Sequence, residues 1–411
     1  MNRLIFLLTL LSLTFFSCLA QRVETGLEVL QHNQFSILKG KKVGLITNPT
    51  GVNKQLESTV DILFNAPEAD LVALYGPEHG VRGDYYAGDQ VAFFKDPKTG
   101  LPVFSLHGKT KKPTQEMLKN IDILVYDIQD IGSRSYTYIS TLGLAMEAAA
   151  ENNIKMVVLD RPNPLGGLKM EGLVTEPDFI SFVSQFPIPY VHGLTVGELA
   201  RYLNGEGLLK NSAQCDLEVV QMNGWKRSMN FEDTQLPWIP SSPHIPHPHS
   251  SYYYPVSGIL GELYVYSIGV GYTLPFQLFA TEWIDADSLA TNLNALALPG
   301  LIFRPVHFKP YYSVSKGKMV HGVQVHITDY EKAPLSLIQF YILQESHKLW
   351  PDKNVFELCN ASRISMFDKV CGSDKIRKTF TQRWLVEDIQ PMWYQDIKSF
   401  RQKAEPYFLY N

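Results

Sequence analysis

Cysteine is scarce in this sequence of 411 residues, which contains four. Cys18 lies in an apolar N-terminal stretch, and the other three, Cys215, Cys359 and Cys371, are too few for a disulfide scaffold. Cys359 and Cys371 are a candidate pair in an oxidising compartment. CxxC, HExxH and zinc-type spacings are absent, so no metal site of these kinds is expected.

An excess of charge of either sign is also absent. The formal net charge is −4, the pI is about 6.3, and no long basic run occurs. Nucleic-acid-binding proteins neutralise phosphates with clustered Lys and Arg. Nucleic acid is therefore excluded as an expected partner, whereas a neutral or anionic small substrate is compatible with this balance.

Three common catalytic motifs are missing. No GxGxxG follows the first expected strand, and neither GxxxxGK[ST] nor GxSxG is present. These absences argue against a dinucleotide site, P-loop nucleotide hydrolysis and the usual hydrolase serine. We therefore expect no cofactor and no metal, and the remaining chemistry points to carboxylates.

Residues 1–20 have the order of a secretory signal peptide. Asn2 and Arg3 supply a charged start, a mainly apolar run follows, and small residues precede Ala20. The run is too short to span a membrane. Ser17-Cys18 resembles a lipobox, which would leave a lipid anchor on Cys18; cleavage after Ala20 is the alternative. Either outcome predicts an extracytoplasmic protein, periplasmic or lipid-anchored.

Short apolar runs without alternation suit strands that are buried on both faces. Four such runs are Lys42–Thr47, Leu71–Tyr75, Ile121–Tyr126 and Met156–Leu159. Helical periodicity at Gln55–Phe64 and Thr141–Asn152 separates strands, as in right-handed βαβ units. The hairpin turns of an antiparallel sandwich are scarce. The fold class is therefore α/β, with a parallel sheet in the N-terminal domain.

The first domain is expected to span residues 24–240. Thr195 and Glu198 have the spacing of a capping box, which predicts a helix, and Cys215–Met222 is a candidate edge strand. The proline-rich segment 237–258 is expected to be a crossover that forms neither a helix nor a central strand.

A smaller α+β domain is expected over residues 250–411. Val323–Ile327 has the pattern of a strand, and Leu335–Trp350 and Lys375–Trp384 have the pattern of helices.

Ligands of open parallel sheets bind outside the carboxyl ends of the strands. Each of the four expected strands ends in a polar loop. The richest loop holds Glu78, His79 and Arg82 between glycines, which allow sharp turns and close approach to a ligand. A solvated turn with incidental charge is the alternative.

Two further loops and one histidine complete the candidate site. In 127–138, polar side chains suit a polyhydroxylated ligand, although Asp130 and Arg134 could instead form a structural ion pair. Prolines stiffen the next loop, which suits recognition. The substrate-binding candidates are His79, Arg82, Gln129, Asp130, Arg134, Tyr136, Tyr138, Arg161, Asn163 and His192. His192 is a structural donor in the alternative.

Carboxylates are the candidate catalytic groups. Glycoside hydrolysis needs one carboxyl group to protonate the leaving oxygen and often a second as nucleophile or base. Glu78, Asp127, Asp130 and Glu171 all lie on strand-end loops, and Glu78, Asp127 and Glu171 are the favoured three. The prolyl-histidyl cluster of His244, His247 and His249 is a weaker candidate for metal binding, since no acidic or cysteine partner is near in sequence.

Together these loops resemble the exo-β-N-acetylmuramidases of the NamZ family. The resemblance rests on five segments in the family's order, GPEHG, DIQDIG, YTYIST, DRPNP and HGLTVGELA, which fall between about residues 76 and 200. It implies a Rossmann-like catalytic domain, a smaller C-terminal domain and an active cleft between them. It also implies release of N-acetylmuramic acid from the non-reducing end of peptidoglycan fragments without metal or nucleotide, with Glu78 as the catalytic glutamate.

The chain departs from the family in one motif of the second domain. The family usually reads Glu-Gly-Thr-Asn-Leu-Ser-Glu-Gly-Arg-Gly-Thr where this chain has Glu262 to Tyr272, so a Glu becomes Ile268 and the Arg becomes Val270. If that arginine binds the lactyl carboxylate, only Arg134 and Arg161 are candidate replacements. Two hypotheses follow: a hydrolase of muramic acid or a related amino sugar, or a non-catalytic cell-wall sugar-binding protein.

Overall fold

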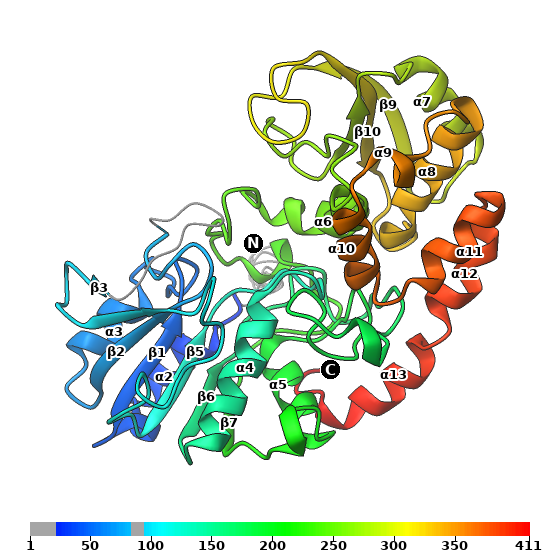
Figure 1. The fold of residues 1–411 in the computed structure, drawn as a ribbon. Coiled ribbons are helices and arrows are strands. Elements are labelled where there is room, and N and C mark those ends of the chain that lie inside the picture. Colours follow the sequence, from blue (N-terminus) through cyan, green and yellow to red (C-terminus); the bar gives the residue numbers. More distant parts are fainter. Residues whose placement is uncertain (1–21, 84–93) are drawn as a thin grey trace, which may run out of the picture.

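The computed structural model describes residues 22–83 and 94–411, which form two lobes (Figure 1). The first lobe is built on a seven-stranded sheet of order β3-β4-β2-β1-β5-β6-β7. Its strands are β1 (Lys42–Thr47), β2 (Asp70–Gly76), β3 (Phe94–Lys95), β4 (Pro102–Ser105), β5 (Ile123–Asp127), β6 (Lys155–Leu159) and β7 (Leu217–Val220). Among these described strands every neighbouring pair is parallel except β3 and β4, which confirms the α/β class.

Helices cover both faces of this sheet. The helices α2 (Gly26–His32) and α3 (Thr59–Asn65) share one core with the sheet, whereas α4 (Tyr138–Glu151) and α5 (Val196–Gly205) share another. In β5, Leu124 and Tyr126 point into the α4/α5 core and Val125 points into the opposite core. Because both faces are buried, the strands carry uninterrupted apolar runs.

The predicted capping box is present at the start of α5. Thr195 Oγ1 accepts a hydrogen bond from Glu198 N, and Glu198 Oε2 accepts one from Thr195 N, each at 3.1 Å. The helix α3 begins at Thr59, later than the expected Gln55, because Ser58 is its N-cap. A side-chain acceptor at this position fixes where a helix begins.

The second lobe is a smaller α+β unit, as predicted. Its sheet has the order β8-β10-β9 and is antiparallel, with β8 (Leu278–Thr281), β9 (Leu301–Phe308) and β10 (Val320–Ile327). Its helices are α6 (Pro248–Gly261), α7 (Ala286–Ala295), α8 (Ile338–Leu349), α9 (Val355–Leu358), α10 (Ala361–Cys371), α11 (Lys375–Arg383) and α12 (Val386–Tyr394).

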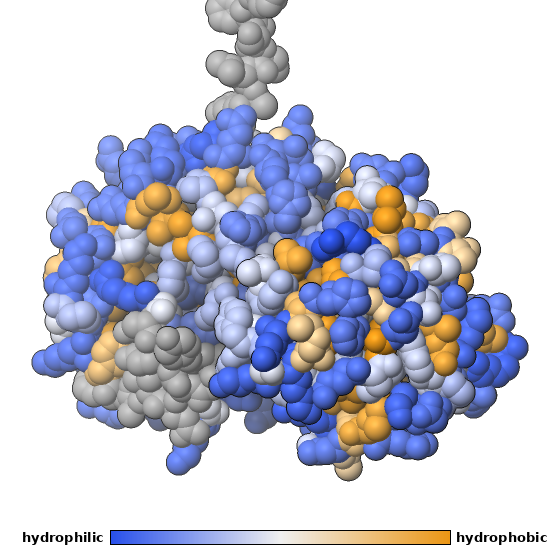
Figure 2. All heavy atoms as spheres, turned by 90° about the horizontal axis from the view of Figure 1, so that it is seen from above, coloured by the Kyte–Doolittle hydropathy of each residue, from blue (hydrophilic) through white to orange (hydrophobic). Residues whose placement is uncertain are grey.

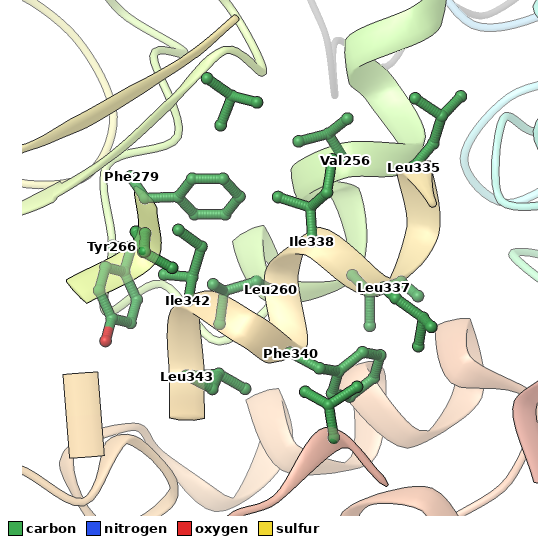
Figure 3. Packing of buried hydrophobic residues seen from close by; sticks show 14 of the residues in the cluster. Val256, Leu260, Tyr266, Phe279, Leu335, Leu337, Ile338, Phe340, Ile342 and Leu343 are labelled. Atoms are coloured by element: carbon green, nitrogen blue, oxygen red, sulfur yellow. The ribbon is translucent and has the colours of Figure 1, made fainter. Parts of the chain in front are cut away.

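The core of the second lobe lies between α6, α8 and the small sheet. Figure 3 shows Val256 and Leu260 of α6 meeting Ile338 and Ile342 of α8, with Phe279 of β8 beside them. All five are fully buried. At about 25 cal/mol per Å² of apolar surface, burial of this kind is the main stabilising contribution to the lobe.

The expected crossover over 237–258 is wrong in its second half. The helix α6 begins at Pro248, which stands in its first turn, and continues through Pro255. A proline in the first turn costs no hydrogen bond because that N–H has no partner within the helix. The carbonyl of Pro255 accepts from Gln339 Nε2 at 3.1 Å, and Val256 and Leu260 are both buried in the core of the lobe. Packing therefore outweighs the low helix propensity of the segment.

The C-terminal residues return to the first lobe. The helix α13 (Ile397–Ala404) runs beside α5, and the rings of Phe400 and Tyr202 lie 5.4 Å apart at their centroids (Figure 1). The hydroxyl of Tyr410 donates to Asp160 Oδ2 at 2.6 Å, just beyond the end of β6. Asp160 is fully buried, and burial raises its pKa to about 7.

Two expectations concern cysteines and the N-terminus. Cys215, Cys359 and Cys371 are free thiols in the structure, so the candidate pair of Cys359 and Cys371 is not formed. The expected signal segment and Cys18 lie outside the described residues.

The surface seen in Figure 2 is largely hydrophilic, and its hydrophobic residues occur in small separate groups. No helix within residues 22–83 and 94–411 has the length and apolar character needed to cross a bilayer.

Arg134 joins the two lobes and is fully buried. Its guanidinium donates to the carbonyls of Leu173 and Ile188 at 2.6 Å each, and to those of Val370 and Cys371 at 2.9 Å each. The first two carbonyls belong to the first lobe and the last two end α10. Because Nε donates to Ser184 Oγ at 3.2 Å, Arg134 has no donor left for a substrate, and the alternative ion pair with Asp130 is not formed. Its role is to hold the lobes together.

We predict that Arg134→Met lowers the free energy of unfolding by about 3–5 kcal/mol. The variant leaves four buried carbonyls without their donor, and unpaired buried polar groups are costly. Denaturant unfolding would measure the loss. Arg383→Met is the matched control, because the Arg383 side chain is 59% exposed and should cost under about 1 kcal/mol. Equal losses in the two variants would contradict the role of Arg134.

Candidate functional site

The loop after β2 presents Glu78 at the carboxyl edge of the sheet. The turn is tight: Gly80 N donates to the carbonyl of Pro77 at 3.0 Å, and His79 and Gly80 have φ values of 73° and 76°. A Cβ on Gly76 would lie 3.1 Å from Val81 N, so the glycine permits the close return of the chain. The loop thus holds Glu78 at the sheet edge, with its side chain 29% exposed.

Glu78 faces a cavity of about 320 Å³ that lies between the lobes. The walls come from the Glu78 loop, the proline-rich segment, α6 and its following loop, and the β9–β10 hairpin. Its lining includes Glu78, His244, Tyr254, Glu262, Ile268, Val270, Phe276, Ser313 and Val314. On the Glu78 side, His107 Nδ1 lies 4.0 Å from Glu78 Oε2.

Glu262 brings a second carboxyl group to this cavity. It follows directly after α6, and its side chain is 32% exposed. Burial raises the pKa of Glu262, while the Arg363 guanidinium, 3.8 Å away, acts in the opposite direction. The raised pKa favours the protonated carboxyl, which is the form that donates a proton.

Sequence reasoning missed Glu262 as a functional residue. The available signal was its place in the second-domain motif, where it stands at the first glutamate of the family pattern, six residues before Ile268. Glu262 is retained in this motif, whereas Ile268 and Val270 replace the polar residues of the family. Both substituted positions line the same cavity, which makes its wall apolar there.

Tyr254 lines the cavity together with the two glutamates. Burial raises the pKa of Tyr254, and the negative charges of Glu262 and Glu78 raise it further. Its hydroxyl lies 3.2 Å from Ser135 Oγ. The phenol therefore remains protonated, and its oxygen stays available as a hydrogen-bonding group at the cavity.

Tyr136 and Tyr138 bind the proline-rich segment that contributes His244 to the cavity. The Tyr138 hydroxyl donates to the carbonyl of Ser241 at 2.6 Å, and the Tyr136 hydroxyl lies 2.7 Å from Ser241 Oγ. Burial raises the pKa of both phenols, and Glu78 also raises that of Tyr138. These tyrosines anchor the proline-rich segment instead of lining the cavity that holds Glu78.

Asp127 is bound in a buried ion pair, which argues against its expected catalytic role. Its carboxylate accepts from Arg161 Nε at 2.5 Å and Nη2 at 2.9 Å, and from Thr59 Oγ1 at 2.5 Å. Asp127 is fully buried. Both Asp127 and Arg161 are thus committed to each other, so Arg161 is not available to replace the missing family arginine.

Glu171 is also committed to the structure. Its carboxylate accepts from Leu335 N at 3.2 Å, and from Ser336 N and Oγ at 2.8 and 2.7 Å. It lines a separate hollow of about 780 Å³ together with Lys169 and Tyr330, away from Glu78. The geometry thus makes Glu171 a connection between the lobes, in place of the catalytic role expected from the sequence.

The remaining amide and histidine candidates fix the loops. Gln129 Nε2 donates to the carbonyl of Pro162 at 2.6 Å, and Asn163 Nδ2 donates to that of Leu194 at 3.0 Å. His192 Nδ1 accepts from Leu194 N at 3.2 Å, in line with the structural alternative. Asp130 Oδ2 accepts from Gly132 N at 2.8 Å and lies 3.4 Å from His192 Nε2. These four residues build the sheet edge without lining the cavity.

Arg82 and His249 lie apart from the two glutamates, unlike His244. Arg82 pairs with Asp96 at 2.6 Å and Asp61 at 3.2 Å. His249 lies 3.3 Å from Glu232, whereas His244 lines the cavity with its pKa lowered by burial and by nearby His79. Within the described part of the chain no three His, Cys, Asp or Glu residues are grouped as metal ligands.

Comparisons with known proteins agree with the earlier resemblance over nearly the whole chain. Residues 43–249 match the family model described as exo-beta-N-acetylmuramidase NamZ, N-terminal, and residues 252–410 match its C-terminal counterpart. The chain is 46% identical to the peptidoglycan beta-N-acetylmuramidase NamZ of Bacillus subtilis (strain 168), over 95% of this chain and 92% of that protein.

Two crystal structures of DUF1343 family proteins from Bacteroides fragilis NCTC 9343 are also similar. One is 61% identical with a TM-score of 0.91, and the other is 30% identical with a TM-score of 0.77. Each comparison covers 95% of this chain and 99% of the other.

Proposed function

Because the chain belongs to the NamZ family of exo-β-N-acetylmuramidases, we propose that Glu78 and Glu262 are the carboxyl groups with which it cleaves glycosidic bonds. It is an exo-acting glycoside hydrolase of peptidoglycan fragments, from whose non-reducing end it releases N-acetylmuramic acid or a related amino sugar. The observation that carries the catalytic assignment is the single cavity shared by the two glutamates.

The two carboxyl groups can divide the chemistry. Glycoside hydrolysis needs a proton on the leaving oxygen and a carboxylate that either attacks the sugar or activates water. The raised pKa of Glu262 suits it as proton donor, and Glu78 supplies the carboxylate. Tyr254, in the same cavity, offers its hydroxyl to a sugar hydroxyl or to water. Both proton transfers are thus assigned to side chains, so the proposal needs no metal and no nucleotide.

The cavity also suits an exo mode of action. A volume of about 320 Å³ is at the lower end of the range for small-ligand sites, and it accommodates a terminal sugar. A non-catalytic sugar-binding protein would keep the fold as well. It would have no need of a partly buried glutamic acid with a raised pKa opposite a second glutamate, which favours the enzyme.

We propose an extracytoplasmic location as part of this function. The charged, apolar and small-residue order of residues 1–20 supports export, with either a free N-terminus after Ala20 or a lipid anchor at Cys18. Peptidoglycan-derived saccharides are found in the same compartment.

We predict that Glu78→Gln lowers turnover of a chromogenic N-acetylmuramic acid glycoside by about two to four orders of magnitude. The amide keeps the shape of the side chain but can serve neither as base nor as nucleophile. The thermal midpoint should change little, because Glu78 is on an edge loop. Glu116→Gln, an exposed substitution in the same lobe, should retain full activity. Full activity of Glu78→Gln would remove this residue from the mechanism.

We predict that Arg363→Met moves the alkaline limb of the pH–activity profile to higher pH by up to about one unit. If protonated Glu262 is the donor, activity falls as pH rises through its pKa. The positive charge of Arg363 holds that pKa down, so its removal raises the pKa and extends activity upward. The full pH profile of kcat/KM is the measurement.

The control is Arg383→Met. It changes an exposed side chain on α11 and should not move the alkaline limb of the profile. Arg363 also stacks on Tyr264, with its guanidinium 3.6 Å from the ring centroid. Loss of that contact would lower the rate at every pH without moving the limb. A limb that stays or moves to lower pH excludes Glu262 as the donor.

The sugar preference should follow from the apolar wall at Ile268 and Val270. None of the described residues that line the cavity is a lysine or arginine. The lactyl carboxylate of muramic acid therefore finds no positively charged side chain in the cavity lining. Arg134 and Arg161, the replacements expected from the sequence, are both engaged elsewhere.

We therefore predict less than a hundredfold preference for N-acetylmuramic acid over N-acetylglucosamine glycosides in kcat/KM. The double variant Ile268→Glu with Val270→Arg should raise this preference, since a charge-assisted pair contributes roughly 1.5–3 kcal/mol. Val270→Met is the uncharged control of similar reach. A wild-type preference of a hundredfold or more, about 2.7 kcal/mol, contradicts the prediction.

A further inference from the structure

A second, open hollow of about 840 Å³ adjoins the cavity that holds the glutamates. Tyr264, Ser313 and Val314 line both, so the two hollows are adjacent at these residues. We call this second hollow the outer groove. It extends from the shared residues past Trp283 of the loop after β8 to Lys316 of the β9–β10 hairpin.

The hairpin wall between cavity and outer groove is held in place. Tyr311 N donates to the carbonyl of Gly271 at 3.0 Å, and Gly317 N donates to that of Pro310 at 2.7 Å. A Cβ on Gly271 would lie 2.1 Å from the carbonyl oxygen of Tyr312, so the two segments are in close contact. The boundary of the groove is therefore built by backbone contacts between the hairpin and the loop after α6.

Tyr264 stands at the junction as a fixed aromatic surface. Its φ is 57°, an unusual conformation for a bulky residue, and 53% of it is exposed. The Arg363 guanidinium covers its ring at 3.6 Å from the centroid. Behind the groove, Trp283 packs between Tyr266 and Trp350, with ring centroids 5.9 and 5.5 Å away. An amphipathic ring at such a junction suits the apolar face of a sugar.

The charge of the groove favours an anionic ligand. Lys318 pairs with Glu282 at 2.8 Å, and both line the groove. Lys316, on the same hairpin, has no ion-pair partner within 4.0 Å among the residues that the structure describes. One uncompensated positive charge therefore lies along the groove.

We propose that the outer groove binds the part of the substrate that remains after the terminal sugar is released. In this arrangement the terminal sugar occupies the cavity, the scissile bond lies near Tyr264, and the next sugars extend along the groove. Lys316 pairs with a carboxylate carried by them. The inference rests on the proposed function and extends it, because it names the leaving-group side of the same site.

The test compares two substrates in the variant Ser315→Trp, which fills the outer groove at a residue that does not line the cavity. A chromogenic N-acetylmuramic acid glycoside needs only the cavity, whereas a peptide-bearing peptidoglycan tetrasaccharide needs both. We expect kcat/KM for the tetrasaccharide to fall at least about tenfold, and that for the chromogenic glycoside to stay within about twofold. Ser399→Trp on α13, an exposed serine distant from the groove, should change neither.

A second pair of variants tests the charge. Lys316→Glu should lower kcat/KM about three- to tenfold for the peptide-bearing tetrasaccharide and much less for the chromogenic glycoside. Lys398→Glu makes the same charge change on α13 and should have no effect. The effect of Lys316→Glu should weaken in high salt.

The groove assignment is overturned if Ser315→Trp affects both substrates equally, or neither, in a protein whose wild type cleaves both. Wild-type protein that cleaves neither substrate would instead overturn the proposed function. Calorimetric binding of the intact tetrasaccharide would then test the groove directly: weaker binding by Ser315→Trp supports the assignment, and unchanged binding overturns it.

Discussion

The site depends on one constraint, the fixed position of the second lobe over the first. Glu78 stands on a loop of the parallel sheet, whereas Glu262 ends α6 at the base of the other lobe. The cavity that they line exists only while the two lobes keep their relative position. The buried guanidinium of Arg134 maintains it, because its hydrogen bonds reach carbonyls on both sides. A planar group with five donors can satisfy several carbonyls at once, which a lysine could not.

Many of the polar side chains at the sheet edge stabilise the loops around the site and take no part in its chemistry. The buried pair of Asp127 and Arg161 holds the ends of β5 and β6 together, and that of Glu198 and Arg227 joins the first turn of α5 to the loop after β7. Glu171 binds the amides of the 3-10 turn that precedes α8 and joins the lobes a second time. Such charges must be paired once they leave water, so they stabilise one loop arrangement and become unavailable to a ligand. The two glutamates of the cavity differ in remaining partly exposed.

The cavity and the outer groove differ in size and openness, and this difference indicates which end of a saccharide each would bind. The cavity is the smaller space and contains both glutamates, with Ile268, Val270 and Phe276 elsewhere in its wall. The groove is open and carries the charged residues Lys316 and Lys318. A chain end enters a confined space more readily than an internal segment does. The architecture therefore agrees with removal of terminal sugars.

The sequence by itself determined the local and periodic features of this protein. Buried strands produce uninterrupted apolar runs, and a capping box needs only Thr195 and Glu198, three positions apart. The family motifs likewise lie within short segments, and they located Glu78. The tertiary structure alone decided which carboxyl groups are free. Asp127 meets Arg161 across 34 positions, and Glu171 meets Ser336 across 165. It also decided that Pro248 and Pro255 lie in a helix, since burial against α8 outweighs their propensity. Glu262 likewise owes its burial, its raised pKa and its partner Arg363 to contacts between residues far apart in the chain, which no short segment of sequence contains.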